Sequence, residues 1–280
     1  MSRLKFTKMV GAGNDFVVID TRLSVIGVRL SLPKLACALC ERKTGVGADG
    51  ALVLEKSKKA DFKMRIFNAD GSEAEMCGNG LRCAVLHAGK KRKVKIETMA
   101  GMYEAEITGK NRVRIKMAGP KDLKKDLCII VNGRAIKVNY IDTGVPHAVI
   151  FVEGLDKIDV DNIGRGIRYH DEFKPRGTNV DFVEIIDDTS IRMRTYERGV
   201  EGETLACGTG AVASAIISVI GYRLSVIGIN VHTKGGILKV YFKKDGSKVK
   251  DVYLEGEAKI VYKGEVDYVF RFNGSNRNTI

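Results

Sequence analysis

One stretch of the sequence occurs twice, and this repetition limits the folds open to the chain more than any other feature. "RIFNADGSEAEMCGNGLRCAVLHA" begins at Arg65, and "RTYERGVEGETLACGTGAVASAII" begins at Arg194. Each has a short alternating strand pattern, an acidic turn, and Cys-Gly-polar-Gly at the start of an apolar helix pattern. A second match pairs "GAGNDFVVI" at Gly11 with "GTNVDFVEI" at Gly177. We infer a diverged internal duplication whose two domains bring the paired motifs face to face.

Short runs with period-two alternation are spread along the whole chain, for example "FKMRIF", "KVKIET" and "SIRMRTY". Such runs predict mostly antiparallel sheet. Helical patterns are fewer, and the clearest lie near residues 32–42, 79–89 and 209–221. The predicted fold class is α/β of the α+β type, with two pseudo-symmetric domains. Each domain is expected to be a mostly antiparallel sheet wrapped around a central helix, with the active site in the cleft between them.

The segment "MAGPKDL" at residues 117–123 is the expected hinge, because Gly119-Pro120 interrupts any regular element. This position divides the chain into an N-terminal domain over residues 1–118 and a C-terminal domain over residues 119–263.

The composition favours a cytoplasmic protein without a membrane partner. At 280 residues and 44% hydrophobic, the chain can bury a large core. Lys5, Lys8 and Asp15 interrupt any apolar stretch that a signal peptide would need. Residues 204–222 are uncharged but contain several glycines and serines, which indicates a buried helix rather than a membrane span.

The cysteines and the net charge narrow the remaining classes. Six cysteines without a secretory signal indicate free thiols. The C-x2-C of Cys37 and Cys40 has no second pair at zinc-finger spacing, so we expect a buried helix face and no metal site. A net charge of +13 is compatible with nucleic acid, but no aromatic residues interleave with the lysine clusters and no DNA-binding motif is present. We therefore predict no nucleic-acid partner, and a basic nucleic-acid-binding protein remains the rival from another class.

Cys77 and Cys207 are the candidate catalytic residues. A glycine after each cysteine lets a ligand approach the backbone, and the N-terminus of the following helix attracts a carboxylate. The same helix end is expected to lower the pKa of the thiol. Two facing thiols suit removal and return of a proton next to a carboxylate from opposite faces, without a cofactor. The plainer alternative is that both cysteines are small buried residues at helix starts.

With these residues in view, the chain resembles the diaminopimelate epimerases, which are amino-acid epimerases that use no pyridoxal phosphate. The resemblance covers nearly the full length and rests on "GAGNDFVVID", "GVGADG", "RIFNADGSEAEMCGNGLRC", "GVPHAV", "GTNVDFVE", "YERGVEGETLACGTGA" and "KGGILKV". It implies two pseudo-symmetric α/β domains, the first completed by C-terminal residues at about 264–280. It also implies conversion between LL- and meso-diaminopimelate, in lysine biosynthesis.

The resemblance assigns roles to individual residues. Cys77 and Cys207 become the acid/base thiols. The reacting carboxylate is assigned to the backbone of Gly78, Asn79, Gly208 and Thr209. The residues that match substrate-holding positions, chiefly for the distal end, are Asn14, Asn68, Asn179, Glu197 and Arg198. His147 and Glu197 match positions that tune the pKa values of the cysteines.

Some of these assignments have simpler alternatives, and two positions depart from the family pattern. Asn68 can make a turn and Asn14 can cap a strand. Val145 replaces an amide that many members carry, and Gly50 replaces a glutamine. Both departures concern substrate recognition. The near rival is therefore another isomerase of the superfamily, such as a proline racemase or a phenazine-type isomerase, and the oligomeric state is left open, with a homodimer as one option.

Overall fold

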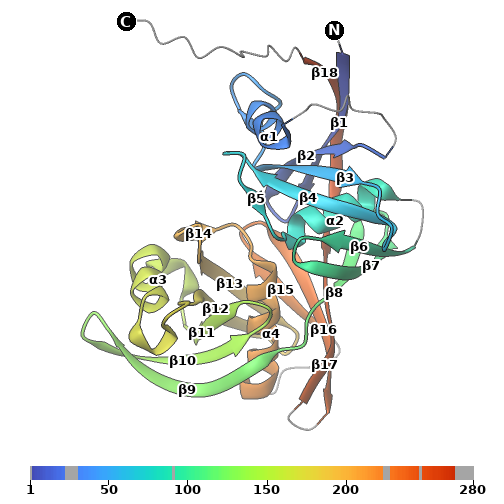
Figure 1. The fold of residues 1–280 in the computed structure, drawn as a ribbon. Coiled ribbons are helices and arrows are strands. Elements are labelled where there is room, and N and C mark those ends of the chain that lie inside the picture. The colour runs from blue at the N-terminus through green and yellow to red at the C-terminus, as the bar shows by residue number, and fades with distance from the viewer. Residues whose placement is uncertain (1, 23–30, 90–91, 223–227, 246–247, 269–280) are drawn as a thin grey trace, which may run out of the picture.

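The computed structural model describes residues 2–22, 31–89, 92–222, 228–245 and 248–268, which fold into two bodies, one above the other in Figure 1. The upper body contains β1 (Ser2–Gly11), β2 (Asn14–Asp20), α1 (Leu32–Cys40), β3 (Gly50–Glu55), β4 (Phe62–Asn68), β5 (Glu73–Ala74), α2 (Gly78–Ala88), β6 (Lys93–Thr98), β7 (Gly101–Gly109) and β8 (Arg112–Lys116). The lower body contains β9 (Lys121–Val131), β10 (Arg134–Asp142), β11 (Pro146–Phe151), α3 (Val160–Arg168), β12 (Asn179–Asp187), β13 (Ser190–Glu197), β14 (Gly202–Thr204), α4 (Gly208–Tyr222), β15 (Ile229–Thr233), β16 (Gly236–Asp245) and β17 (Lys248–Glu257). The last strand, β18 (Lys259–Tyr268), returns to the upper body.

The two bodies have the same strand topology. In the upper body the paired strands run β18-β1-β2-β3-β4-β6-β7-β8, and in the lower body β9-β10-β11-β12-β13-β15-β16-β17. The parallel pairs β2-β3 and β4-β6 have their counterparts in β11-β12 and β13-β15. All other neighbours in both sequences of strands are antiparallel. The fold therefore repeats, as the duplicated Cys-Gly stretch predicts.

The second sequence match is wrong, because its members are not structural equivalents. "NDFVVID" forms β2, which pairs antiparallel with β1 and parallel with β3. "NVDFVEIID" forms β12, which pairs parallel with β11 and antiparallel with β13, so its counterpart in the upper body is β3. The shared "DFV" letters reflect a common need for apolar strand residues rather than common position.

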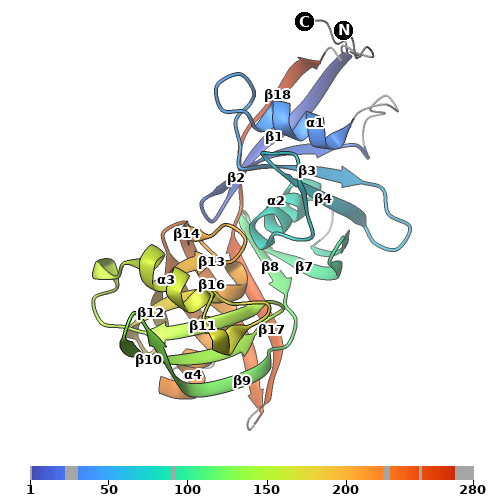
Figure 2. The ribbon, with the colours of Figure 1, turned by 60° about the vertical axis from the view of Figure 1, so that its left-hand side comes forward.

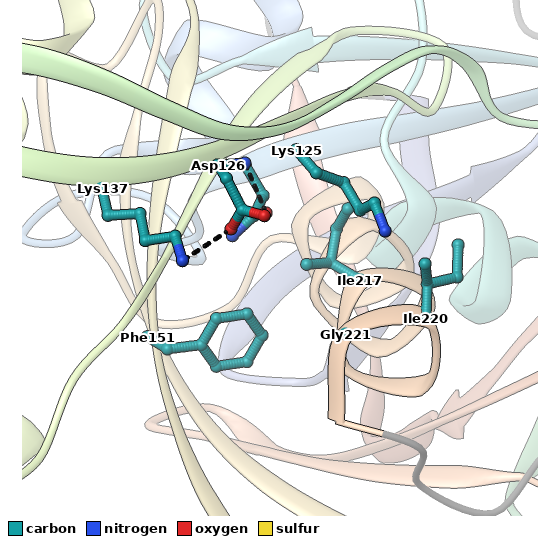
Figure 3. Close-up of a pocket in the computed structure, with 8 residues that line it drawn as sticks. Lys125, Asp126, Lys137, Phe151, Ile217, Ile220 and Gly221 are labelled. Carbon is teal, nitrogen blue, oxygen red and sulfur yellow. Dashed lines mark hydrogen bonds and ion pairs between the residues drawn. The ribbon is translucent and has the colours of Figure 1, made fainter.

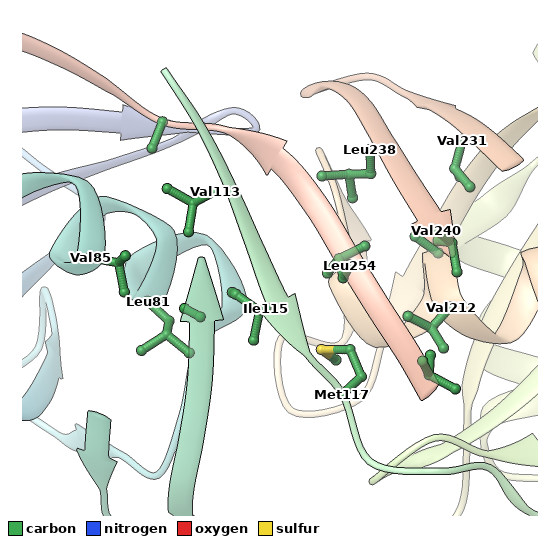
Figure 4. Close-up of a cluster of buried hydrophobic side chains, with 14 of the residues drawn as sticks. Leu81, Val85, Val113, Ile115, Met117, Val212, Val231, Leu238, Val240 and Leu254 are labelled. Carbon is green, nitrogen blue, oxygen red and sulfur yellow. The ribbon is translucent and has the colours of Figure 1, made fainter. Parts of the chain in front are cut away.

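Each body wraps its sheet around one buried helix. α2 contacts β1, β2, β7 and β8, whereas α4 contacts β11, β12, β13 and β16. Pairing of β8 with β17 joins the two sheets, with Ile115 opposite Leu254. Figure 4 shows the apolar side chains on both sides of this junction, from Leu81 and Val85 on α2 to Val212 on α4. One continuous core therefore holds the two helices in fixed positions.

Helix α3 is the one main helix that the sequence patterns did not predict. Asp159 caps it by accepting a hydrogen bond from the Asn162 amide at 3.2 Å. Gly164 and Gly166 hide the pattern, because glycine disfavours a helix interior. Both glycines are needed for packing: a Cβ on Gly164 would lie 2.6 Å from Tyr196, and one on Gly166 would lie 2.6 Å from Val131.

The predicted fold class is confirmed, and Figure 2 shows the same two bodies from a second direction. For the domain limits we propose a boundary near residue 118, between β8 and β9. Pairing of β18 with β1 over Ser2–Val10 favours completion of the first domain by C-terminal residues. The strand begins at Lys259, earlier than the expected 264, and residues 269–280 lie outside the described part of the chain.

Candidate active site

Cys77 immediately precedes α2 and serves as its N-cap. Its sulfur accepts a hydrogen bond from the Gly80 amide at 3.5 Å, and its carbonyl accepts one from Leu81 at 2.8 Å. The side chain is half-buried. Gly78 begins the helix, so the first amides of α2 have no partner within the helix and remain available to an anion.

Cys207 occupies the matching position before α4. Its carbonyl accepts a hydrogen bond from the Ala211 amide at 2.9 Å, and Gly208 is the first helical residue. Only 6% of its surface is exposed. The sulfur lies 3.4 Å from the Thr209 hydroxyl. Both cysteines of the repeated motif are thus placed at helix starts, as predicted.

The expected lowering of the thiol pKa values is not found. Burial raises the pKa of Cys77, although the amides of Gly80 and Asn79 and the charge of Arg82 oppose the shift. Burial raises the pKa of Cys207 well above its usual range, and the negative charges of Glu197 and Asp181 add to the effect. The loss of hydration therefore outweighs the helix N-terminus at both sulfurs.

A chain of side chains connects Cys207 to a buried histidine. The Thr209 hydroxyl is 3.0 Å from Nε2 of His147, and Nδ1 of His147 is 2.7 Å from an oxygen of Asp181. The other Asp181 oxygen accepts a hydrogen bond from Thr195 at 2.7 Å. His147 and Asp181 are both fully buried. Because an ionised carboxylate can only accept, Nδ1 carries a proton, and in the neutral ring Nε2 accepts from Thr209.

Glu197, at the end of β13, acts on both sulfurs. Its negative charge contributes to the raised pKa of Cys77 and to that of Cys207. Burial raises the pKa of Glu197 itself. The same carboxylate therefore contributes to the raised pKa of two cysteines that are 130 residues apart in sequence.

Arg198 and Asn179 form one unit beside Glu197. The Arg198 amide donates to the Asn179 side-chain oxygen at 2.9 Å, and the Asn179 nitrogen donates to the Pro146 carbonyl at 3.0 Å. The Arg198 guanidinium donates to the Arg176 carbonyl at 3.2 Å. The amide group of Asn179 is thus largely used in holding backbone, while the Arg198 side chain is half-buried.

Asn14 and Asn79 are connected in the upper body. The Asn79 nitrogen donates to the Asn14 oxygen at 2.6 Å, and the Asn14 nitrogen donates to Asp49 at 3.1 Å. Arg82 donates to the Asn79 oxygen from inside α2. Asn14 is therefore fixed at both ends of its amide group, which is more than a strand cap requires.

Asn68 lies at the exposed end of β4, where its side-chain nitrogen donates to the Ser72 hydroxyl at 2.9 Å. The Asx turn, the simpler alternative for Asn68, is made by Asp70, which accepts from the Ser72 amide at 2.8 Å. Gly50 lies directly opposite Asn68 across β3 and β4. Val145 lies just before β11 and accepts a hydrogen bond from the Thr143 amide at 3.1 Å.

The two bodies touch beside these residues. A Cβ on Gly13 would lie 3.0 Å from Gly235 and 3.0 Å from Leu205, two residues before Cys207. The Gly235 amide also donates to the Leu205 carbonyl at 2.8 Å. Helices α2 and α4 also contact each other. The duplicated motifs are therefore brought together at the junction of the bodies.

Other features are less suited to chemistry. A cavity of about 320 Å³ lies between β9, β10 and the end of α4, and Asp126 in its lining is 2.9 Å from Lys137. Figure 3 shows this pair among the lining side chains. The charged lining of the cavity includes this exposed ion pair, which joins two neighbouring strands. Among the described residues, no three His, Cys, Asp or Glu side chains are grouped as metal ligands. No helix in the described ranges is both long enough and apolar enough to cross a membrane.

Solved structures of two other proteins share this fold over nearly the whole chain. A Bacillus anthracis phenazine biosynthesis protein of the PhzF family has a TM-score of 0.71 at 17% identity, covering 96% of this chain and 100% of its own. A probable proline racemase from Agrobacterium radiobacter K84 has a TM-score of 0.65 at 16% identity, covering 97% and 94%. The chain thus has the two-domain fold that PhzF proteins share with proline racemases.

The sequence comparisons identify the family, within this fold, to which the chain belongs. The profile of the family described as "Diaminopimelate epimerase" matches residues 6–123 and 139–261. The diaminopimelate epimerase of Aquifex aeolicus is 42% identical over 278 residues, covering 94% of this chain and 98% of its own. That of Methanocella arvoryzae is 43% identical over 286 residues, covering 96% and 99%. This chain belongs to the diaminopimelate epimerase family, as the sequence resemblance indicates, and it is an isomerase.

Sequence reasoning missed several residues that the structure adds to the site. These are Arg82, Asp181 and Thr195, together with Asp49. Each lies next to a predicted residue only through strand register or helix rotation, neither of which is visible in a single sequence. A buried Arg within the apolar pattern "GLRCAVL" was the one available signal.

Proposed function

We propose that Cys77 and Cys207 are the acid and base by which this chain interconverts LL- and meso-diaminopimelate. Membership of the family makes the chain a diaminopimelate epimerase of lysine biosynthesis. The roles of the two cysteines are supported chiefly by one observation. The two sulfurs lie at the starts of two buried helices that contact each other.

In the proposed reaction, a thiolate on one face of the substrate takes the α-proton while the thiol on the opposite face donates its own. The carbon is inverted, no proton is lost overall, and the two sulfurs exchange protonation states. Charge grows on the substrate carboxylate during proton removal. The amides at Gly78, Asn79, Gly208 and Thr209 begin two helices and would stabilise that charge.

The hydrogen-bond chain behind Cys207 supplies a route for its proton. The thiol donates to Thr209, Thr209 donates to Nε2 of His147, and Asp181 stabilises the histidine once it is charged. Movement of one proton along this chain turns the Cys207 thiol into a thiolate. We propose that His147 tunes the pKa of Cys207 through this chain. Glu197 is proposed to tune the pKa values of both cysteines through its negative charge.

For the distal end of the substrate we propose the polar set at the neighbouring strand ends. Arg198 has several planar donors that suit a carboxylate, and only one of them has a partner in the described structure. Asn179 positions Arg198 through its backbone. Asn14 and Asn68 are the remaining candidates, Asn14 fixed by its neighbours and Asn68 exposed.

Incubation of the purified protein with LL-diaminopimelate in heavy water tests reaction and substrate together. We expect meso-diaminopimelate to form with deuterium at the inverted carbon, and no exchange with proline. Cys77→Ala and Cys207→Ala should each stay folded and keep less than about a tenth of wild-type turnover, a loss above about 1.4 kcal/mol. More activity than this in either variant would contradict the two-thiol mechanism, and exchange with proline would favour the racemase-like rival.

We further propose a cytoplasmic location, which the free cysteines of the described chain favour. A homodimer is the assembly to test, and sedimentation of the purified protein would decide it.

A further inference from the structure

Arg82 is a fully buried arginine with almost no partners. It lies on α2 with 0% of its surface exposed, and its one hydrogen bond within the described ranges goes to the Asn79 oxygen. Its Nε and Nη1 atoms have no partner in the part of the chain that the structure describes. Burial of a guanidinium with unmet donors costs free energy, and burial lowers the pKa of Arg82. The fold therefore retains a residue that weakens it.

The surroundings of Arg82 are shaped to admit a cation beneath the start of α2. A Cβ on Gly256 of β17 would lie 2.9 Å from Nε and 3.0 Å from the guanidinium carbon. A Cβ on Gly78 would lie 4.0 Å from Nη1. The guanidinium therefore lies close to the first turn of the helix that Cys77 caps. Its charge acts on the sulfurs of Cys77 and Cys83, and Glu197 on β13 is the other charged group that acts on Cys77.

The internal repeat shows which features of the two cysteine sites differ. Strand register places Phe16 opposite Gly50 in the upper body and His147 opposite Asn179 in the lower. Two residues further along, the lower pair is Asp181 and Thr195, and the upper pair is Leu52 and Ile66. The polar trio behind Cys207, which is His147, Asp181 and Thr195, is thus replaced behind Cys77 by Phe16, Leu52 and Ile66.

Arg82, in contrast, is present at the Cys77 site and has no counterpart at the Cys207 site. Arg82 follows Cys77 by five residues, and the residue five after Cys207 is Val212. Val212 is fully buried among apolar side chains. Cys77 therefore has a fixed positive charge nearby and no titratable relay. Cys207 has a relay and two carboxylates, and no buried cation at the matching place.

We propose that Arg82 is a positioning residue that makes Cys77 the first of the two thiols to lose its proton. The inference rests on the two-cysteine mechanism proposed above. In the free enzyme Cys77 is the base and Cys207 holds the proton. A turnover in one direction reverses this arrangement, and a turnover in the opposite direction, with Cys207 as base and Cys77 as acid, restores it. Arg82 also fixes Asn79, whose amide nitrogen fixes Asn14, so the same cation aligns the first turn of α2.

The test is alkylation of the intact enzyme by iodoacetamide between pH 6 and 10, with separate mass-spectrometric quantification of the peptides that carry Cys77 and Cys207. Because the sulfurs differ in exposure, the midpoint of each pH profile is compared, not the absolute rate. We expect the wild-type midpoint of Cys77 to lie at least about one pH unit below that of Cys207. Arg82→Met should raise the Cys77 midpoint by about one pH unit or more, slow its labelling at pH 7 about tenfold, and leave the Cys207 midpoint in place.

Two variants control for trivial explanations. Arg92→Met removes the same charge from an exposed ion pair with Glu106 and should change neither profile. Arg82→Lys keeps the charge and should restore most of the Cys77 midpoint. A structural role for Arg82 predicts a lower melting temperature in Arg82→Met, whereas removal of an unpaired buried charge predicts an equal or higher one.

An unchanged Cys77 midpoint in folded Arg82→Met, or a wild-type Cys207 midpoint below that of Cys77, overturns the inference. If Arg82→Met does not fold, the wild-type order of the midpoints and the Arg82→Lys profile still decide it. Loss of epimerase activity in Cys77→Ala and Cys207→Ala is measured separately. The proposed function therefore survives a failure of the Arg82 inference alone.

Discussion

Thr209 is the residue whose hydroxyl joins the chemistry of Cys207 to His147. It lies 3.4 Å from the sulfur and 3.0 Å from the imidazole, so it can pass a proton between the two groups. The Thr209 carbonyl is also held by the Thr143 hydroxyl at 3.0 Å, which fixes the first turn of α4. Side-chain substitutions at Thr209 therefore test the relay with the backbone still anchored.

We expect Thr209→Val to lower kcat by about 10- to 100-fold, the usual effect of losing a positioned proton-transfer group. Because the backbone amide stays in place, KM should change little. Thr209→Ser keeps the hydroxyl and should retain most of the activity. Steady-state kinetics with both variants decide the matter, and an equal loss in Thr209→Ser, which keeps the hydroxyl, would contradict the relay.

Arg198 governs the distal end of the substrate in the proposed site. Its planar donors grip a carboxylate in a way that lysine cannot reproduce, so Arg198→Lys should lower kcat/KM for diaminopimelate by about 1.5 to 3 kcal/mol. Lysine lacks only the distal carboxylate and should be a poor substrate for the wild type. Comparable rates with lysine and diaminopimelate, unchanged in Arg198→Lys, would refute the distal assignment.

At the scale of elements, α4 depends on a glycine that makes room for the relay. A Cβ on Gly210 would collide with an Asp181 oxygen, whereas a Cβ on Gly221 of the same helix meets nothing within 4 Å. The same glycine-to-alanine substitution is therefore expected to have opposite consequences at these two positions of α4.

Gly210→Ala should displace Asp181 and His147 and lower kcat at least about tenfold, while Gly221→Ala should leave kcat unchanged. Gly221→Ala should also raise the free energy of unfolding by about 0.5 to 1 kcal/mol, because alanine is the better helix former. Kinetics and urea denaturation of both variants provide the measurement. A normal kcat in Gly210→Ala would mean that Asp181 is not needed where it lies.

A charged cluster ties the loop before β3 to the strands that carry Asn14. Asp15 accepts hydrogen bonds from Arg42 at 3.0 Å and from Lys8 at 2.7 Å. Burial alone would raise the pKa of Asp15, but these cations outweigh it and lower the pKa from 3.8 to about 2. A carboxyl whose pKa is lower in the folded state stabilises the fold above pH 3.8 and ceases to do so as the pH falls toward 2.

We therefore expect Asp15→Asn to lose about 1 to 2 kcal/mol at pH 7, after allowance for solvent screening. The difference from wild type should shrink between pH 4 and pH 2. Urea denaturation at several pH values measures both effects. Asp171→Asn removes an exposed partner of Lys174 and should cause no measurable change. A constant difference down to pH 2 would mean that the charge of Asp15 contributes nothing.

The sequence predicts features that depend on interactions between residues near each other in the chain. It does not predict contacts between residues that are far apart in the chain. α2 and α4 were predicted because their start signals are local, and the Cys-Gly pattern marked both. The "DFV" match misled because similar strands recur throughout a β-rich chain, and only pairing partners distinguish β2 from β12. Asp181 and Arg82 could not be assigned roles, since their neighbours come from strand register and from packing against β17.

At the scale of the whole molecule, one pair of strands joins the sheets of the two halves, and another pair completes the sheet of the first half. β8 pairs with β17, which merges the sheets, and β18 closes the first half by pairing with β1. Phe6 of β1 packs edge to face on Tyr262 of β18, with ring centres 5.9 Å apart. Gly264 leaves room for the Phe6 ring, since a Cβ there would lie 2.8 Å from it.

A chain that ends at Ala258 should therefore be unstable or inactive, because β1 loses its pairing with β18 and exposes Leu4 and Phe6. A synthetic peptide of residues 257–268 should restore folding and activity by adding the missing strand. The same peptide with Gly264→Val should fail, because the side chain would strike Phe6. Full activity of the shortened chain without peptide would show that β18 is dispensable.

The late position of β18 in the chain also sets an order of events during synthesis. β1 leaves the ribosome first among the described strands, and its partner β18 leaves last. The lower body needs nothing from β18, so its strands can pair while translation continues. The first body to be made must wait with one strand edge open until the final described strand emerges, and in that interval it is the part of the nascent protein most in need of a chaperone.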